Sequence, residues 1–180
     1  MSSTYGENLK LSIFGESHGT AIGMTLDGIP AGLPVDFDEL QAFLNRRAPG
    51  QNDWSTPRRE EDRPEFLSGI FEGKSTGCPI GFIVWNENQH SDDYNNLKGV
   101  YRPSHADRVA QVKFHGMNDP RGGGHFSARL TVALVAAGVV AKKILPETVS
   151  FATRLTAVGG ETDPARFDSV IAAAQADGDS

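Results

Sequence analysis

Cysteine is almost absent from this chain, with one residue, Cys78, in 180. A single cysteine excludes a disulfide within the chain, and the first residues lead into no apolar signal segment. Long hydrophobic runs are also lacking, because the unbroken apolar stretch at residues 132–141 is far short of the roughly 20 residues that span a bilayer. We therefore expect a cytoplasmic protein that does not enter a membrane.

An excess of positive charge is missing as well. The net charge is −6, so the chain as a whole has no field that would attract nucleic acid. The spacings HxH, HExxH and CxxC, which are typical of metal sites, do not occur, and we predict no metal site. Against this acidic background, a local group of arginines suits a pocket for a small anion rather than a polymer: Arg46, Arg47, Arg58, Arg59 and Arg63.

The most informative stretch that is present is RGGGHFSAR, from Arg121 to Arg129, followed by the apolar segment LTVALVAAGVVAKKIL. We predict a helix from Ser127 to Leu145 that is buried, because it is apolar on nearly every side. The glycines let the backbone approach a ligand, and the free amides of a helix start favour an anion. An ordinary loop with Ser127 as N-cap would look similar, but the charged neighbours, including His125, favour an anion or cofactor site.

Alternating apolar patterns predict two β-hairpins and one further strand. The expected strands are residues 9–14, 22–26, 65–71, 78–85 and 149–158. The first two pair through a loop that displays Glu16, Ser17 and His18, and the next two form the second hairpin.

Three shorter helices are also expected. Asp36 caps one that runs through Leu44, Ser104 caps one that runs through Phe114, and Pro164 opens the last. Two long polar segments, 51–64 and 86–99, are typical of functional loops or disordered segments. Because strands and helices come in pairs rather than in strict alternation, the pattern favours the α+β class with antiparallel sheet.

Two of the five histidines are candidates for acid–base chemistry, since an imidazole gains or loses its proton near neutral pH. His18 lies in a glycine-flanked turn, and His105 lies near a helix start. Ser17 and His18 do not make a nucleophile pair, because adjacent residues in a tight turn do not normally direct both side chains to one point. The residues alone indicate an α+β protein whose loop histidines and arginines bind an anionic small molecule.

Beyond that point the sequence strongly resembles the chorismate synthase family. The resemblance spans essentially the whole chain and rests on a set of motifs in the expected order: FGESHG at 14–19, DGIP at 27–30, RRAPGQ at 46–51, LSGIFEG at 67–73, RPSHAD at 102–107 and RGGGHFSAR at 121–129. It implies antiparallel sheets packed on a central helical layer, and a homotetramer. It also implies a lyase that converts 5-enolpyruvylshikimate 3-phosphate to chorismate and phosphate by 1,4-anti elimination, in aromatic amino acid biosynthesis. Reduced FMN is required without net redox change, and in some members NADPH reduces the flavin.

The same resemblance implies roles for individual residues. His18 would protonate the departing phosphate, and His105 would act on the flavin side. Basic positions around the substrate and flavin anions are matched by Arg47 and Arg129. The flavin-contacting segment is matched by His125, Phe126 and Ser127.

The chain departs from the family pattern at several positions. Many relatives carry arginine where this chain has Ala48 and Asp53, and Arg-Ser where it has His125-Phe126. Family proteins are about twice as long, so we expect residues 1–180 to be the N-terminal part of a single domain that lacks its second half. Such a chain should bind FMN weakly and turn over little. The alternatives are a non-catalytic fragment that docks onto a complementary C-terminal half, and a flavin-independent phosphatase.

Overall fold

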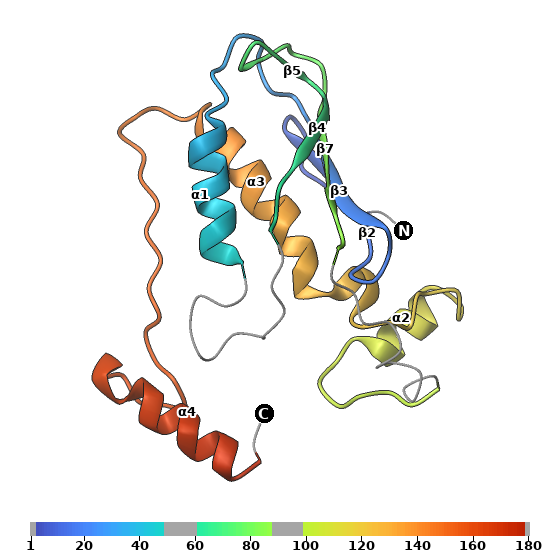
Figure 1. Ribbon diagram of the computed structural model, residues 1–180, viewed down its shortest axis with the longest axis vertical. Coiled ribbons are helices and arrows are strands. Elements are labelled where there is room, and N and C mark those ends of the chain that lie inside the picture. The colour runs from blue at the N-terminus through green and yellow to red at the C-terminus, as the bar shows by residue number, and fades with distance from the viewer. Residues whose placement is uncertain (1–2, 49–60, 88–98, 179–180) are drawn as a thin grey trace. The chain divides into compact units, whose positions relative to one another are not determined.

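The computed structural model describes residues 3–48, 61–87 and 99–178, and the chain divides into two compact units, Met1–Leu145 and Pro146–Ser180 (Figure 1). The strands of the first unit are β1 Thr4–Tyr5, β2 Lys10–Gly15, β3 Ala21–Asp27, β4 Glu65–Ser68, β5 Ile70–Phe71, β6 Lys74–Ser75 and β7 Ile80–Trp85. Its helices are α1 Phe37–Arg47, α2 Asp107–Lys113 and α3 Thr131–Lys142, with short 3₁₀ turns η2 Gly124–Phe126 and η3 Ala128–Leu130. The second unit contains η4 Pro164–Arg166 and α4 Phe167–Ala176.

The predicted α+β class with antiparallel strands is confirmed. Five strands form one antiparallel sheet in the order β1-β2-β3-β7-β4, and β5 and β6 form a small two-stranded sheet. The first predicted hairpin is present, since β2 pairs with β3. In the second, β4 pairs with β7, but the expected strand at 65–71 ends at Ser68, and Ile70–Phe71 pair with Lys74–Ser75 in the small sheet. Figure 1 shows α1 and α3 side by side on one face of the sheet. Within the first unit, α1 and α3 thus form a helical layer that covers one face of the five-stranded sheet.

The core lies between this sheet and the two helices. The paired strands β3 and β7 place three pairs of apolar side chains on the helix-facing side: Ile22 with Val84, Met24 with Phe82 and Leu26 with Ile80, all at most 1% exposed. Alternation along each strand puts every second residue on the same face, which is why these six gather. Leu40 and Leu44 of α1 pack against them together with the buried side of α3. Each such side chain stabilises the fold by roughly 1.5–3 kcal/mol.

The predicted cap of α1 is confirmed. The Asp36 carboxylate accepts a hydrogen bond from the Glu39 amide at 2.9 Å and so satisfies one of the free N–H groups of the first turn. Glu39 in turn accepts from Lys142 of α3 at 2.7 Å, which links the two helices at their solvent edge.

The helix after the glycine loop begins later than predicted. Ser127 caps the 3₁₀ turn η3, where its hydroxyl accepts from the Arg129 amide, and the α-helix starts at Thr131. The prediction of a core helix is confirmed, since six residues of α3 are buried in the core: Val132, Ala133, Ala136, Ala137, Val139 and Val140. Burial is not complete, because Leu134 is 50% exposed and Gly138 on the same side is exposed too. Within the first unit, one stripe of α3 therefore faces outward.

Two further predictions are wrong. Ser104 does not cap α2: the N-cap is Ala106, which makes no side-chain cap bond, and Ser104 has a φ of +63°. Residues 149–158 form no strand beyond a single bridge from Val158 to Glu161, and the second unit contains no described strand with which they could form a ladder. The start of the last helical segment is confirmed, with Asp163 accepting from the Ala165 amide.

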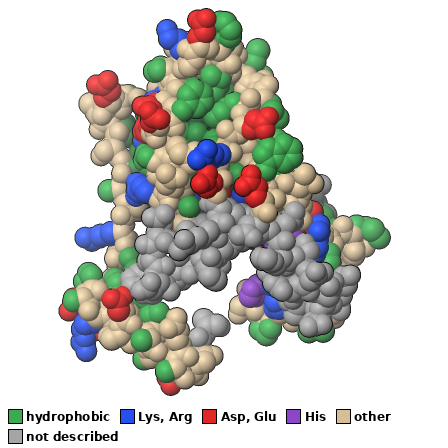
Figure 2. All heavy atoms as spheres, viewed as in Figure 1, with side chains coloured by type: hydrophobic (Ala, Val, Ile, Leu, Met, Phe, Trp, Pro, Cys, Tyr) green, Lys and Arg blue, Asp and Glu red, His purple; other side chains and the backbone are tan. Residues whose placement is uncertain are grey.

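Residues 51–60 of the first long polar segment and 88–98 of the second lie outside the described part, and so does Asp53. Ala48 is the C-cap of α1. None of the helices in the described ranges is long and apolar enough to cross a bilayer. On the face shown in Figure 2, acidic, basic and hydrophobic side chains are interspersed over the described surface.

Candidate functional site

The turn between β2 and β3 holds His18 inside the protein. Ser17 and His18 are only 1% and 6% exposed, so the expectation that this turn displays them is wrong. The glycine loop covers them: the Ser17 amide donates to the Gly124 carbonyl at 3.1 Å. Gly122 lies so close that a Cβ on it would be 2.5 Å from two ring atoms of His18, and its φ is +58°. Only glycine allows that approach.

Ser17 and His18 are also closer than the sequence suggested. The Ser17 hydroxyl and Nδ1 of His18 are 3.1 Å apart, within hydrogen-bond distance, although adjacent side chains in a turn were expected to diverge. The reason is again the covering loop, which closes over both side chains and keeps them on one side of the turn. This contact orients the imidazole.

The two arginines predicted to bind anions lie together around a buried carboxylate. Arg129, 7% exposed, donates from Nη1 to Oδ1 of Asp62, which is 1% exposed. Nε of Arg47 is 3.5 Å from the other oxygen of Asp62, and its Nη1 donates to the Arg129 carbonyl at 3.3 Å. One buried carboxylate thus brings two guanidinium groups to the same place.

Asp62 was missed in the sequence because it lies in a polar run that has no secondary-structure pattern. A signal did exist, since a buried arginine needs a counter-charge and Asp62 belongs to the segment that follows the arginine-ended helix α1. The pattern alone could not say which of the acidic residues in that run is the one inside.

Asn86, also missed, connects the arginine cluster to the His18 turn. It directly follows β7 and is 8% exposed. Its side-chain amide donates to the carbonyls of Glu16 and Gly19, at 3.0 and 2.8 Å, and its carbonyl oxygen accepts from Nε of Arg129 at 3.1 Å. His18 lies between the two residues whose carbonyls this amide holds. The structure thereby links His18, Arg129 and Arg47, three predicted site residues, in one network.

His105 lies in a different setting. It is exposed, and its Nδ1 is 2.9 Å from the Pro103 carbonyl. The segment around it is braced by Arg102, which makes a two-point ion pair with Asp107 and donates to the Gly122 carbonyl at 2.7 Å. The Arg102 guanidinium lowers the pKa of Asp107 from 3.8 to about 2.

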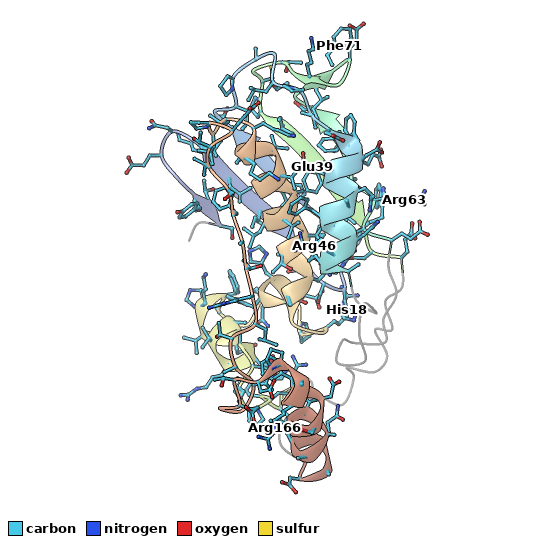
Figure 3. All side chains as sticks on the ribbon, turned by 90° about the vertical axis from the view of Figure 1, so that its left-hand side faces the viewer. His18, Glu39, Arg46, Arg63, Phe71 and Arg166 are labelled. Atoms are coloured by element: carbon cyan, nitrogen blue, oxygen red, sulfur yellow. The ribbon has the colours of Figure 1, made fainter. Side chains whose placement is uncertain are left out.

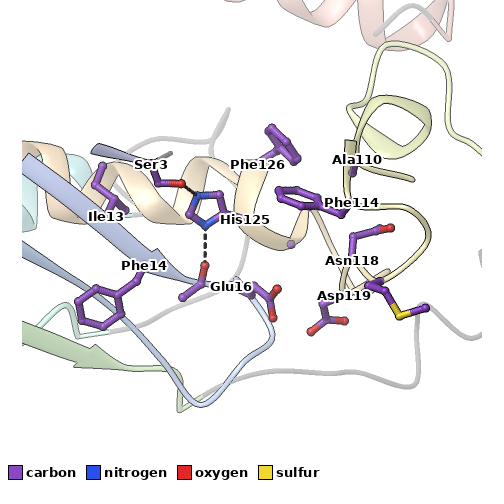
Figure 4. A pocket seen from close by; sticks show the side chains of 14 residues that line it. Ser3, Ile13, Phe14, Glu16, Ala110, Phe114, Asn118, Asp119, His125 and Phe126 are labelled. Atoms are coloured by element: carbon purple, nitrogen blue, oxygen red, sulfur yellow. Dashed lines mark hydrogen bonds between the residues drawn. The ribbon is translucent and has the colours of Figure 1, made fainter. Parts of the chain in front are cut away.

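His125 and Ser127 use their side chains within the protein. Nδ1 of His125 is 2.9 Å from the Gly15 carbonyl, and its Nε2 is 2.9 Å from the Ser3 hydroxyl (Figure 4). Because a carbonyl only accepts, Nδ1 carries the proton and Nε2 accepts from Ser3. The Ser127 hydroxyl caps the Arg129 amide.

A pocket of about 350 Å³ opens beside this histidine, as Figure 4 shows. Aromatic rings of Phe114 and Phe126 line it, together with the carboxyl groups of Glu16 and Asp119. Burial and the neighbouring Asp119 raise the pKa of Glu16, whereas the Arg121 guanidinium lowers that of Asp119.

The residues expected at the flavin therefore fit that group only in part. Phe126 is 40% exposed and offers an aromatic surface, but the side chains of His125 and Ser127 are already bonded within the chain. The described residues do not make a complete flavin site. No group of three or more metal-ligating side chains occurs among them either.

Comparisons with known proteins agree on one family. The family model described as chorismate synthase matches residues 9–178. The chorismate synthase of Bacteroides thetaiotaomicron is 60% identical over 145 residues, covering 81% of this chain and 40% of the relative. That of Bacteroides fragilis is 53% identical over 168 residues, covering 93% and 46%. A solved structure titled "Crystal Structure of Chorismate Synthase" matches with a TM-score of 0.52 and 33% identity, over 76% of this chain and 33% of that one. The chain thus spans less than half the length of these relatives.

Proposed function

The chain belongs to the chorismate synthase family, and from that membership we propose that it is the N-terminal part of a lyase converting 5-enolpyruvylshikimate 3-phosphate to chorismate and phosphate. The observation that carries the proposal is the joining of His18 to a buried arginine pair through Asn86. A proton donor linked to two guanidinium groups suits a reaction whose leaving group is phosphate.

In this proposal Arg47 and Arg129 hold the anionic substrate. Guanidinium groups bind phosphate and carboxylate oxygens by paired hydrogen bonds. Both guanidinium groups lie against the carboxylate of Asp62, which brings two potential anion-binding groups to one place. Asp62 also fixes the two side chains, which reduces the entropy lost when a substrate binds.

His18 is the proposed proton donor to the phosphate as its C–O bond breaks. Its ring is held in place by the Ser17 hydroxyl and by the glycine loop above it. Burial excludes bulk water from the donor, and a positioned imidazolium contributes about 10²–10⁴-fold to such a step. His105 is proposed to act on the flavin side, at the exposed segment that Arg102 braces.

Reduced FMN is proposed as the cofactor from family membership. When bound it supplies electron density for phosphate loss, but the described residues complete no flavin site and we derive no step through it. NADPH-dependent flavin reduction, a homotetramer and a cytoplasmic location also remain predictions.

Anaerobic turnover of 5-enolpyruvylshikimate 3-phosphate tests the proposal, with chorismate absorbance followed with and without reduced FMN. The 180-residue chain alone should give little product. Adding the complementary C-terminal part of a close relative should give FMN-dependent chorismate formation, and the same mixture with His18→Ala should not. Phosphate release without flavin would overturn the lyase proposal in favour of a phosphatase.

A second candidate is a fragment that docks with a C-terminal half without contributing chemistry. The outward stripe of α3, with Leu134 half-exposed, favours a docking role. The His18→Ala mixture separates the two: full turnover would mean that this chain only docks.

A further inference from the structure

We propose that Asn86 is a positioning residue that holds His18 and Arg129 in a fixed relation, so that the proton donor and the anion-binding cation move as one unit. This inference rests on the proposed function of those two residues. Asn86 touches neither the imidazole nor the proposed anion; it acts through the turn backbone and through the guanidinium.

The Asn86 side chain spans both ends of the His18 turn. One amide group donates to Glu16 O at 3.0 Å and to Gly19 O at 2.8 Å, so the residues before and after Ser17-His18 are tied to a single nitrogen. The carbonyl oxygen of the same side-chain amide, Oδ1, accepts a hydrogen bond from Nε of Arg129 at 3.1 Å. A flipped amide would place oxygen against two carbonyls and NH₂ against a cation, so only this orientation satisfies all three partners.

The position of Asn86 makes this a rigid link. It follows the last residue of β7, whose partner β3 begins just after the turn, and its own amide donates to Thr20 O at 3.1 Å. The carbonyl of Trp85, one residue earlier, accepts from Nη2 of Arg129 at 3.4 Å. Both the turn and the guanidinium group are thus hydrogen-bonded to residues at the end of the central strand β7. Sites built on regular elements hold their geometry more precisely than sites built on loops.

Asparagine is the residue type that this link needs. Aspartate has the same shape and would still accept from Arg129, but it has no N–H for the two turn carbonyls and would repel them. Asn86→Asp therefore removes the hydrogen bonds to the two turn carbonyls and keeps the one from Arg129. Arg129→Lys removes the hydrogen bond that Asn86 accepts, because lysine has no Nε–H at that position, while it keeps the positive charge beside Asp62.

Ser75 offers a matched control. It is 4% exposed and also ties loop segments together, donating to the Pro30 carbonyl at 2.6 Å and accepting from the Leu33 amide at 3.0 Å. It lies in β6, which pairs with β5, and Figure 3 shows the β5 residue Phe71 at the opposite end of the first unit from His18. Ser75→Ala thus removes a buried polar link without touching the proposed site.

The experiment uses ¹H–¹⁵N spectra and amide hydrogen exchange of the whole 180-residue chain. In Asn86→Asp we expect the His18 ring signals to shift and exchange of the Ser17 amide to accelerate about tenfold, while the Arg129 Nε–H signal persists. In Arg129→Lys the His18 signals should shift as well, which is the sign of coupling through Asn86. In Ser75→Ala neither should change.

The positioning role would be overturned if, in both Asn86→Asp and Arg129→Lys, the His18 ring signals kept their wild-type chemical shifts and the Ser17 amide exchange rate stayed within twofold of wild type. Equal changes in Ser75→Ala would overturn it as well. Inorganic phosphate added to the wild type tests the proposed anion site separately. If it shifts neither His18 nor Arg129, the anion site fails, whereas the role of Asn86 is judged from the phosphate-free spectra.

Discussion

His18 and His105 have similar neighbours in the sequence, since each follows a serine and precedes a small residue. Both were predicted to take part in acid–base chemistry, yet one is buried and the other is exposed. His18 is 6% exposed under the glycine loop and is joined through Asn86 to Arg129. His105 is exposed on the segment that Arg102 and Asp107 brace. The two regions meet at Gly122, whose absent side chain admits His18 and whose carbonyl accepts from Arg102.

The different burial of these two regions predicts how strongly a single polar group affects stability in each. In the His18 region each buried charge depends on a particular partner, and removing one leaves another uncompensated in a low-dielectric interior. In the 102–107 segment water can replace a lost partner, so single changes there should have small effects. Variants that break one partner at a time test this contrast.

The largest loss is expected for Asp62→Asn, which removes the buried carboxylate that pairs with both Arg47 and Arg129. Urea denaturation should show a loss of roughly 3–5 kcal/mol. Glu61→Gln is the matched control, because the adjacent Glu61 pairs with Arg63 on the surface, and it should change stability by less than about 0.5 kcal/mol. Inorganic phosphate should restore part of the loss in Asp62→Asn; equal stability of the two variants would contradict the contrast.

The next largest effect is expected for Gly122→Ala. Its Cβ would lie 2.5 Å from the His18 ring, at a φ of +58°. The strained backbone and the clash together should destabilise the fold by roughly 2–3 kcal/mol and shift the His18 ring signals. Gly73→Ala has a φ of +72° but no atom within 4 Å of the new Cβ, so it isolates the backbone part. If Gly122→Ala and Gly73→Ala lower the free energy of unfolding by the same amount, close contact between the glycine loop and the His18 ring is contradicted.

A smaller, pH-dependent effect is expected in the 102–107 segment. The pKa of Asp107 is lowered from 3.8 to about 2 by Arg102, so its ion pair stabilises the fold above pH 4 and is lost as pH falls through about 2. Asp107→Asn should cost about 1 kcal/mol at pH 6. Unfolding measured at pH 6, 4 and 2.5 should show that difference shrinking with falling pH. A constant difference would mean that charge is not the cause.

The smallest effect is expected for His105→Gln. Since the ring is exposed and is 2.9 Å from one nearby carbonyl, stability should change by less than about 0.5 kcal/mol. The phosphate-induced shift of the Arg129 signal should also be unchanged in His105→Gln but reduced in His18→Gln. A loss of stability comparable to that of Gly122→Ala would place His105 inside the folded network after all.

Local patterns in the sequence predicted local structure well. The alternation in β2 and β3 gave the first hairpin, and Asp36 and Asp163 mark true helix starts, because each depends only on residues a few positions away. The expected strand at 149–158 is wrong, because a strand exists only through a partner and the second unit contains no described strand that could pair with it.

The site was predictable only where a motif marked it. The motifs named His18 and the two arginines that the structure links, but they did not name Asp62 and Asn86, although both are at least nine-tenths buried. Both side chains accept hydrogen bonds from Arg129, which is 67 residues from Asp62 and 43 residues from Asn86 in the sequence. No periodicity or turn chemistry encodes a contact of that range.

These separations also set an order of events in time. The His125–Gly15 contact that closes the glycine loop onto β2 joins residues 110 positions apart, whereas β2 and β3 pair across one short turn. Hairpins form in about 1–10 μs, while closing long loops is entropically slower and delays folding. A newly made chain should therefore have its first hairpin well before the glycine loop encloses His18, so the proton on this imidazole should stay open to water until late in folding.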